Sequence, residues 1–190
     1  MILTEEQEMI RATARDFSRT HLAPHAAGWE RTATFPRQAL REMGRLGFMG
    51  ITVPPEWGGA GTDYVAYALA LEEIAAGDGA SSTVMSGHNS VGCMPILDYG
   101  TDVQKERYLR PLASGEKLCA FCLTEPHSGS DASALKSKAE LRGDRYVLNG
   151  TKQFITTGKN ADVALVFALT GPGGGKRGIS AFIVETTWPG

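Results

Sequence analysis

The sequence predicts an α+β protein, with an all-α helical domain in residues 1–115 followed by a partial antiparallel β domain in residues 116–190. Before about residue 115, apolar residues recur at helical spacing behind helix-capping patterns. After Gly115, short apolar runs are separated by turns that contain glycine, which is typical of strands. Because the helical and strand patterns occupy separate stretches, the chain fits an α+β arrangement better than an alternating α/β one.

The helical region opens with a capping box, Thr4-Glu-Glu-Gln7, and apolar residues follow it at helical spacing. We expect Leu22 and Pro24 to end this first helix, because proline interrupts a helix interior. Pro36 fits a first-turn position, and Gly47 fits the end of the second helix. Further helices are expected over residues 64–76 and 81–97, and from a second capping box at 101–104 towards residue 109.

The pattern of residues 116–190 predicts strands. Strands are expected over residues 118–124, 136–141, 145–148, 152–156, 163–169 and 179–185. Asn149-Gly150 is a strong signal for a type I′ hairpin turn. The run from Gly173 to Gly178 matches a dinucleotide fingerprint, but it precedes a strand rather than a helix, so we interpret it as a hairpin loop.

Composition excludes several function classes. The 190 residues carry a formal net charge of −2 and are 42% hydrophobic, so no basic surface for nucleic acid or an anionic membrane is expected. No apolar run reaches the length of a membrane-spanning helix. The acidic start of the chain does not fit a signal or transit peptide, so we expect a cytoplasmic, bacterial protein.

Cysteine and histidine patterns do not favour a metal site. Cys119 and Cys122 are three apart on an expected strand and therefore face opposite sides, so we interpret them as buried structural thiols. Pro24 separates His21 from His25, and no third ligand is near. The remaining polar candidates are interpreted structurally: His88 as a satisfied polar group rather than a ligand contact, Glu72–Glu73 as a solvated or interhelical pair, and Glu125 as a carboxylate that holds backbone amides or a basic neighbour rather than as a catalytic base.

Two segments favour a binding site. Cys122-Leu-Thr-Glu-Pro-His-Ser-Gly-Ser-Asp131 ends a strand in a turn of small residues, which suits an anionic phosphate. In Asn149-Gly-Thr-Lys-Gln-Phe-Ile-Thr156, Phe154 and Thr156 would project from the same face of a strand. Phe154 offers a ring for stacking and Thr156 a hydroxyl donor, so this pair suits the binding of a flavin.

These residues resemble the acyl-CoA dehydrogenase family. The 122–134 segment fits the family's first signature along its full length, and Pro55-Glu-Trp-Gly-Gly-Ala-Gly61 resembles its N-terminal helical domain. The resemblance covers the whole chain and implies FAD as cofactor, an acyl-CoA thioester as substrate and α,β-dehydrogenation as reaction. It further implies an electron-transferring flavoprotein as partner, a role in fatty acid β-oxidation and a homotetramer when complete.

The resemblance also implies roles for individual residues. Those expected to bind the cofactor are Phe121, Leu123 and Thr124 along the flavin and ribityl chain, Gly129 and Ser130 at the pyrophosphate, and Phe154, Ile155 and Thr156 at the isoalloxazine ring. Ser130 is also expected near the acyl-CoA. His127 departs from the family, in which this position is commonly small.

No residue of the sequence matches the family's catalytic base, which the resemblance places beyond Gly190. We therefore expect either a piece of a normal dehydrogenase or a half-protein that needs a partner chain. An incomplete β domain would have open strand edges and an uncovered face. Two alternatives stay open for the function: a non-catalytic acyl-CoA or flavin-binding module, and an acyl-CoA oxidase.

Overall fold

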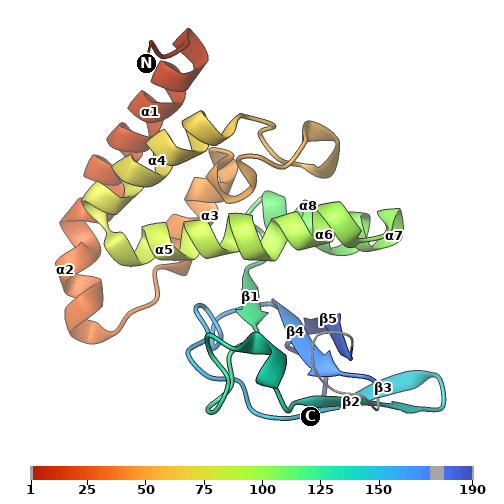
Figure 1. The fold of residues 1–190 in the computed structure, drawn as a ribbon. Helices are drawn as coiled ribbons and strands as arrows, with labels where there is room; N and C mark the ends of the chain where they lie inside the picture. The colour runs from red at the N-terminus through yellow and green to blue at the C-terminus, as the bar shows by residue number, and fades with distance from the viewer. Residues whose placement is uncertain (1, 172–177, 190) are drawn as a thin grey trace. The chain divides into compact units, whose positions relative to one another are not determined.

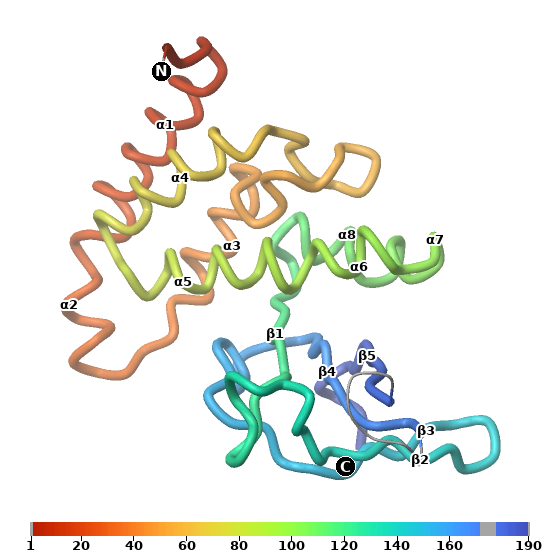
Figure 2. Tube along the Cα trace, viewed as in Figure 1, coloured from red at the N-terminus to blue at the C-terminus, as the bar shows by residue number. Residues whose placement is uncertain are grey.

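The computed structural model describes residues 2–171 and 178–189, and the chain divides into two compact units, Met1–Leu118 and Cys119–Gly190 (Figures 1 and 2). The first unit is helical and the second contains the sheet, which confirms the predicted fold class in its order. Most of the glycine-rich run from Gly173 to Gly178 lies outside the described residues.

The helical unit contains α1 (Glu5–Phe17), α2 (Ala23–Thr32), α3 (Arg37–Arg45), α4 (Tyr64–Gly77), α5 (Gly79–Gly87), α6 (Met94–Tyr99), α7 (Asp102–Gln104) and α8 (Arg110–Ala113). Both predicted capping boxes are confirmed, because the side chains of Thr4 and Gln7, and of Thr101 and Gln104, bond each other's backbone amides. Gly47 follows α3 with a φ of 83°, a left-handed conformation that suits glycine at a helix end.

The expectation that Leu22 and Pro24 end the first helix is wrong. A π-helical turn, Ser18–Leu22, joins α1 directly to α2, and the Ala23 amide bonds the carbonyl of Ser18 five residues back. This wider turn places Pro24 in the first turn of α2, where its missing N–H costs little. The helix therefore continues past the proline.

The same arrangement occurs twice more. The π-helical turn His88–Cys93 joins α5 to α6, and the turn Lys105–Leu109 joins α7 to α8. Pro95 and Pro111 each stand one residue after the amide that closes the turn. As a result, the predicted helix over residues 81–97 is one continuous rod in Figure 1, from α5 through α6.

The core of the helical unit is formed by apolar side chains from α1, α3, α4 and α5. Helices α1 and α4 lie side by side in Figure 1, and Arg15 of α1 bonds Glu73 of α4, with 3.0 Å between Nε and Oε2. Glu73 thus has the interhelical pairing role that the sequence suggested. The buried apolar residues of the cluster are Ala14, Phe17, Leu22, Ala39, Leu40, Met43, Phe48, Met49, Ile51, Ala70, Ile74, Val84, Met85 and Leu118.

The second unit contains β1 (Cys119–Cys122), β2 (Lys138–Arg142), β3 (Arg145–Asn149), β4 (Val163–Leu169) and β5 (Ile179–Glu185). The sheet is mixed rather than purely antiparallel, which corrects the prediction. β4 pairs parallel with β1 and with the start of β2, and antiparallel with β5, while β2 and β3 form an antiparallel hairpin. The parallel pairs β1–β4 and β2–β4 join segments far apart in the sequence, so no local turn signal predicts them.

The predicted strand over residues 152–156 is absent, and Asn149-Gly150 is not a hairpin turn. The turn of the hairpin lies instead at Gly143-Asp144, between β2 and β3. A side chain at Gly150 would meet the Ser137 side chain at 2.1 Å, so this glycine serves a close approach of two backbone segments. Residues 150–162 form an irregular segment that leads into β4.

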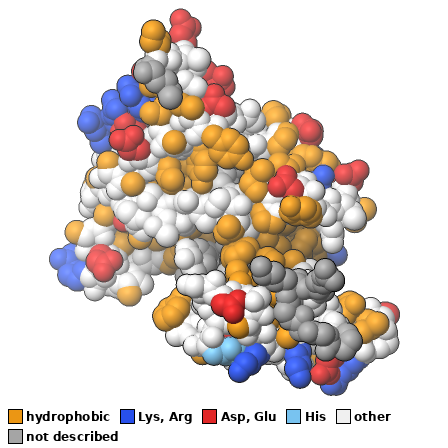
Figure 3. Space-filling view, viewed as in Figure 1, with side chains coloured by type: hydrophobic (Ala, Val, Ile, Leu, Met, Phe, Trp, Pro, Cys, Tyr) orange, Lys and Arg blue, Asp and Glu red, His pale blue; other side chains and the backbone are white. Residues whose placement is uncertain are grey.

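Among the described residues, no helix is long and apolar enough to cross a bilayer. Figure 3 shows the basic side chains in separate groups on the face in view, with acidic side chains among them.

Candidate functional site

The candidate site begins with a tight turn after β1. Glu125 and Ser128 form an isolated β-bridge, with backbone bonds of 2.8 Å and 3.1 Å in the two directions. The Ser128 hydroxyl donates to the carbonyl of Asp131 at 2.8 Å, and the Asp131 carboxylate accepts from the amide of Ser133. These internal bonds fix the backbone that presents Gly129 and Ser130 to solvent.

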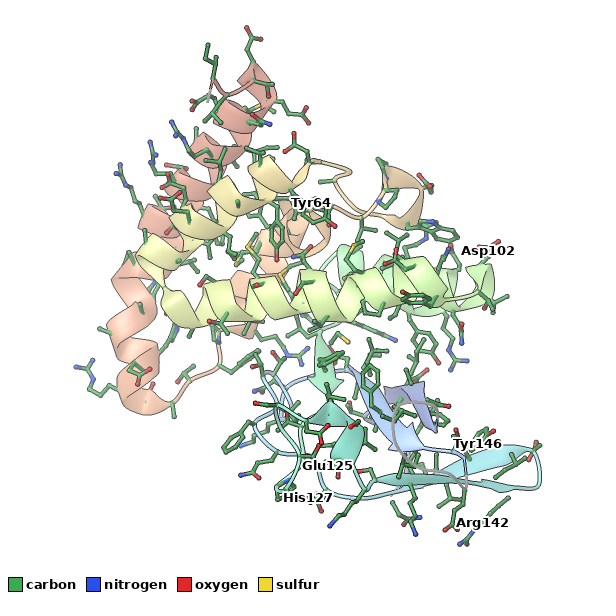
Figure 4. The ribbon with its side chains drawn as sticks, in the orientation of Figure 1. Tyr64, Asp102, Glu125, His127, Arg142 and Tyr146 are labelled. Carbon is green, nitrogen blue, oxygen red and sulfur yellow. The ribbon has the colours of Figure 1, made fainter. Side chains whose placement is uncertain are left out.

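The Glu125 side chain is 2% exposed and lies at the centre of this turn. Its Oε2 accepts from the amide of Lys136 at 2.6 Å, and its Oε1 accepts from the amide of Ser137 at 2.9 Å. The Lys152 ammonium donates to Oε1 at 2.9 Å, and His127 Nε2 lies 3.3 Å from Oε2 (Figure 4 labels Glu125 and His127). The prediction that Glu125 holds backbone amides and a basic neighbour is confirmed.

Two opposing effects determine the charge of this carboxylate. Burial alone would raise the pKa of Glu125, but the Ser137 side chain, the Lys152 ammonium and the two amides stabilise the anion and lower its pKa to about 2. Since the Ser137 Oγ forms no hydrogen bond within the described residues, the bonds that hold the anion are those from the Lys152 ammonium and from the amides of Lys136 and Ser137. Glu125 is therefore a fixed anion near neutral pH and a poor proton acceptor.

The structure brings the 122–131 segment and the 149–156 segment together, but through side-chain and backbone hydrogen bonds rather than through the expected hairpin and strand. Lys152 donates to the carbonyl of Leu123 at 3.0 Å as well as to Glu125, and the Gln153 amide donates to the carbonyl of Thr124 at 2.9 Å. These contacts, rather than a strand pair, connect the turn to residues 154–156. Lys152 and Gln153 were not among the predicted site residues, and the only signal for them in the sequence is their position within the 149–156 segment.

The segment that carries Phe154 has unusual backbone geometry. Phe154 and Thr157 have φ angles of 57° and 66°, in the left-handed region that bulky and β-branched residues rarely adopt. Phe154 is also 85% exposed, so its ring is displayed to solvent instead of packing in the core. Bonds from the Gly158 amide to Ile155 and from the Asn160 amide to Thr157 hold this strained segment in place. Such strain is found most often at ligand-binding and active sites.

Hydroxyl groups in this part of the chain fall into two classes. Those of Ser128 and Ser133 bond within the turn. By contrast, the hydroxyls of Thr124, Ser130 and Thr156, the three predicted to contact the cofactor, have no hydrogen-bond partner within the described residues. They are free to bond water or a ligand.

The space around Gly129 is also open. A Cβ built at this residue would meet no atom of the described part of the chain within 4 Å, so the described contacts do not require glycine here.

An open hollow of about 510 Å³ adjoins the turn. It is lined by Leu123, Ser130, Asp131, Ala132, Ser133, Phe167 and Ile179. The rings of Phe121 and Phe167 lie 5.0 Å apart, centroid to centroid, and extend the apolar surface beside the hollow. Leu123 and Ser130 are thus brought to one cavity.

A larger groove of about 980 Å³ lies elsewhere in the sheet unit, between β3 and β5. It is lined by Arg145, Tyr146, Val147, Leu148, Asn149, Phe182, Ile183, Val184, Trp188 and Pro189, and holds none of the predicted site residues. Tyr146 and Phe182 meet edge to face across it at 5.2 Å.

The two cysteines of β1 and His88 have structural roles. Burial raises the pKa of the Cys119 thiol to about 12 and also raises that of Cys122, which suits inert thiols. His88 is buried, with Nε2 2.9 Å from the carbonyl oxygen of Leu112, as expected for a satisfied polar group. No cluster of three metal-ligating side chains occurs in the part of the chain that the structure describes.

Comparison with known proteins agrees with this arrangement. Residues 4–116 match the family model for the acyl-CoA dehydrogenase N-terminal domain, and residues 120–190 match that for the middle domain. An acyl-CoA dehydrogenase of Bacillus subtilis is 50% identical over all 190 residues of this chain, which cover 50% of that relative. The chain therefore spans about half the length of the curated relatives that it matches.

Solved structures give the same result. The butyryl-CoA dehydrogenase of Megasphaera elsdenii matches with a TM-score of 0.95 and 39% identity, covering all of this chain and 51% of that one. A glutaryl-CoA dehydrogenase of Mycobacterium smegmatis, solved in complex with FADH2, matches with a TM-score of 0.91 and 39% identity, covering 99% and 47%. With both family models matched in succession, this chain belongs to the acyl-CoA dehydrogenase family and comprises its N-terminal domain and residues of its middle domain.

Proposed function

We propose that this chain forms the N-terminal and middle parts of an FAD-dependent acyl-CoA dehydrogenase, which introduces a double bond between the α and β carbons of an acyl-CoA thioester. The observation that carries the proposal is the joining of two segments. Lys152 and Gln153 hold the turn with Thr124 and Ser130 against the segment with Phe154 and Thr156. Family membership supports the same reaction.

The residues present suit a bound flavin. The exposed Phe154 ring offers a stacking surface, and the three hydroxyls that have no partner among residues 2–171 and 178–189 offer hydrogen bonds. Open space at Gly129 would admit an anionic group close to the backbone. FAD also fits the relatives, since one solved neighbour contains FADH2.

Each predicted residue has a role in this proposal. Phe121, Leu123 and Thr124 lie along the flavin and its ribityl chain, and Gly129 and Ser130 contact the pyrophosphate, with Ser130 also near the acyl-CoA. Phe154 and Ile155 pack at the isoalloxazine ring, and Thr156 donates a hydrogen bond near flavin N5. Bound FAD supplies the acceptor for the hydride that leaves the β carbon.

No residue of this chain is assigned as the base that removes the α proton. Glu125 is unsuited to that role, because its carboxylate is buried, paired with Lys152 and has its pKa lowered to about 2. The proposal therefore places the base in the part of the dehydrogenase that this chain does not span. The same applies to the adenine-side contacts of FAD and to much of the tetramer interface.

The first test is an anaerobic visible spectrum of the chain with FAD, recorded before and after butyryl-CoA is added. We expect a bound, oxidised flavin that butyryl-CoA does not bleach. Bleaching would show that the chain contains or recruits a working base. If no flavin binds, the cofactor assignment of these residues is wrong for the isolated chain.

The other expectations belong to the same proposal: bacterial cytoplasmic location, fatty acid β-oxidation, a homotetrameric complete enzyme and electron-transferring flavoprotein as acceptor. An acyl-CoA oxidase would differ by using oxygen, so oxygen uptake without the flavoprotein separates the two. A purely binding module would retain FAD without turnover even when the second half of the dehydrogenase is supplied.

A further inference from the structure

The contacts around Thr124 show how closely the two segments of the site depend on one side chain. The Lys152 ammonium bonds Leu123 on one side of Thr124 and Glu125 on the other, at 3.0 Å and 2.9 Å. The next amide along the chain, that of Gln153, bonds the carbonyl of Thr124 itself. Lys152 and Gln153 thus contact the backbone at Thr124 and at both of its neighbours, while the Thr124 hydroxyl has no hydrogen-bond partner among the residues that the structure describes.

Burial makes this contact sensitive to the loss of either charge. The Lys152 side chain is 12% exposed and the Glu125 side chain is 2% exposed. Removing one member of a buried pair leaves the other charge poorly compensated, which is costlier than losing a surface pair. The two amides that also bond Glu125 come from Lys136 and Ser137, so the carboxylate connects the turn to the start of β2 as well.

The geometry beyond Lys152 transmits this contact to the exposed ring. Phe154 follows Lys152 by two residues, in the left-handed conformation that tertiary contacts must maintain. Displacing residues 152–153 from the turn would remove the contacts that precede this strained residue. The position of the ring would then no longer be fixed relative to the Thr124 hydroxyl.

We propose that Lys152 and Glu125 are a positioning pair, which sets the placement of Phe154 and Thr156 relative to Thr124 and thereby the orientation of the bound flavin. The inference rests on the proposed function for its last step only. The placement of the two segments is a property of the chain and can be measured without cofactor.

The test compares Lys152→Met with Lys136→Met and Lys152→Arg. Lys136→Met is the matched control, because its side chain is exposed and only its backbone amide contacts Glu125. Lys152→Arg keeps a cation and tests rescue. Glu125→Gln provides a second way to break the pair if Lys152→Met does not fold, as judged by circular dichroism.

The first readout is hydrogen exchange at the Gln153 amide, without cofactor. We expect Lys152→Met or Glu125→Gln to speed exchange by about tenfold or more, the factor that corresponds to about 1.4 kcal/mol, while Lys136→Met stays within about twofold. Lys152→Arg should recover part of the protection. Unchanged exchange in both pair variants would overturn the proposal.

The second readout is the flavin spectrum and FAD affinity. Lys152→Met and Glu125→Gln should lower the affinity for FAD by about tenfold and shift the visible absorption bands of the bound flavin. Lys136→Met should do neither. If exchange responds while FAD binding and spectrum do not, the effect on flavin orientation is overturned. If the unmodified chain binds no FAD, the proposed function fails for this chain, and the exchange result still decides whether Lys152 and Glu125 position the two segments.

Discussion

The imidazole of His88 lies with Nε2 2.9 Å from the carbonyl oxygen of Leu112, and both residues are buried in the helical unit. The contact joins the π-helical turn after α5 to α8, and Asn89 beside it bonds the carbonyls of Phe48 and Met85. Buried polar groups of adjacent residues therefore connect three parts of the helical unit.

Acid should destabilise the helical unit through His88. Burial lowers the pKa of His88 from 6.5 to about 4, so the unfolded chain binds a proton more readily than the folded one between these values. The stability contributed by neutral His88 should be fully present well above pH 6.5, should fall as the pH drops through that value, and should be about 2 kcal/mol lower at pH 5. Glu125, whose pKa is lowered to about 2, loses its contribution only below pH 4.5.

The measurement is urea unfolding of the wild-type chain and His88→Gln at pH 7.5 and pH 5, followed by helical circular dichroism. His88→Gln should remove most of the difference between the two pH values, and His25→Gln, at an exposed position, should leave it unchanged. An equal pH dependence in wild type and His88→Gln would contradict this account.

Replacement of Phe154 by glycine should stabilise the fold and weaken the site. Phe154 has a φ of 57° and is 85% exposed, so glycine relieves backbone strain without creating a cavity. The free energy of unfolding should rise by about 0.5–1 kcal/mol. Phe154→Ala retains the strain and removes the ring, so it should weaken FAD binding without the gain in stability. The prediction fails if both variants change stability equally.

Substitution by alanine should destabilise the fold at Gly150 but leave its stability almost unchanged at Gly129. At Gly150 the added Cβ would meet Ser137 Oγ at 2.1 Å, so Gly150→Ala should cost about 1–3 kcal/mol in chemical denaturation. At Gly129 the added Cβ would meet no described atom within 4 Å, so Gly129→Ala should change stability by less than about 0.5 kcal/mol. If the pyrophosphate of FAD approaches the backbone at Gly129, Gly129→Ala should still lower the affinity for FAD. Unchanged FAD affinity would remove Gly129 from the proposed site.

Thr156→Val should separate binding from chemistry in the complete dehydrogenase. The hydroxyl has no partner within the described residues, so stability should stay the same when it is lost. Losing a hydrogen bond near flavin N5 should slow flavin reduction by about tenfold or more, while FAD remains bound. Stopped-flow bleaching with acyl-CoA measures the rate, and a rate equal to that of wild type would exclude the role. Ser130→Ala is expected instead to weaken FAD or acyl-CoA binding.

Local signals in the sequence proved more informative than distant ones. The pairs Thr4–Gln7 and Thr101–Gln104 could be predicted because a capping box is complete within four residues. The strand expected over residues 152–156 could not be corrected from sequence, because the contacts of Lys152 with Leu123 and Glu125 cross almost thirty positions. The parallel pairing of β1 with β4 is non-local in the same way.

The three π-helical turns before Pro24, Pro95 and Pro111 have a consequence for comparing homologous sequences. Each turn contains one residue more than an α-turn. Each later residue therefore faces a direction about 100° around the helix axis from the one it would face in an uninterrupted α-helix. A relative that lacks one of these prolines would need to lose one residue nearby to keep its later side chains facing the same neighbours. Single-residue gaps in alignments should therefore gather at these turns, together with the loss of the proline.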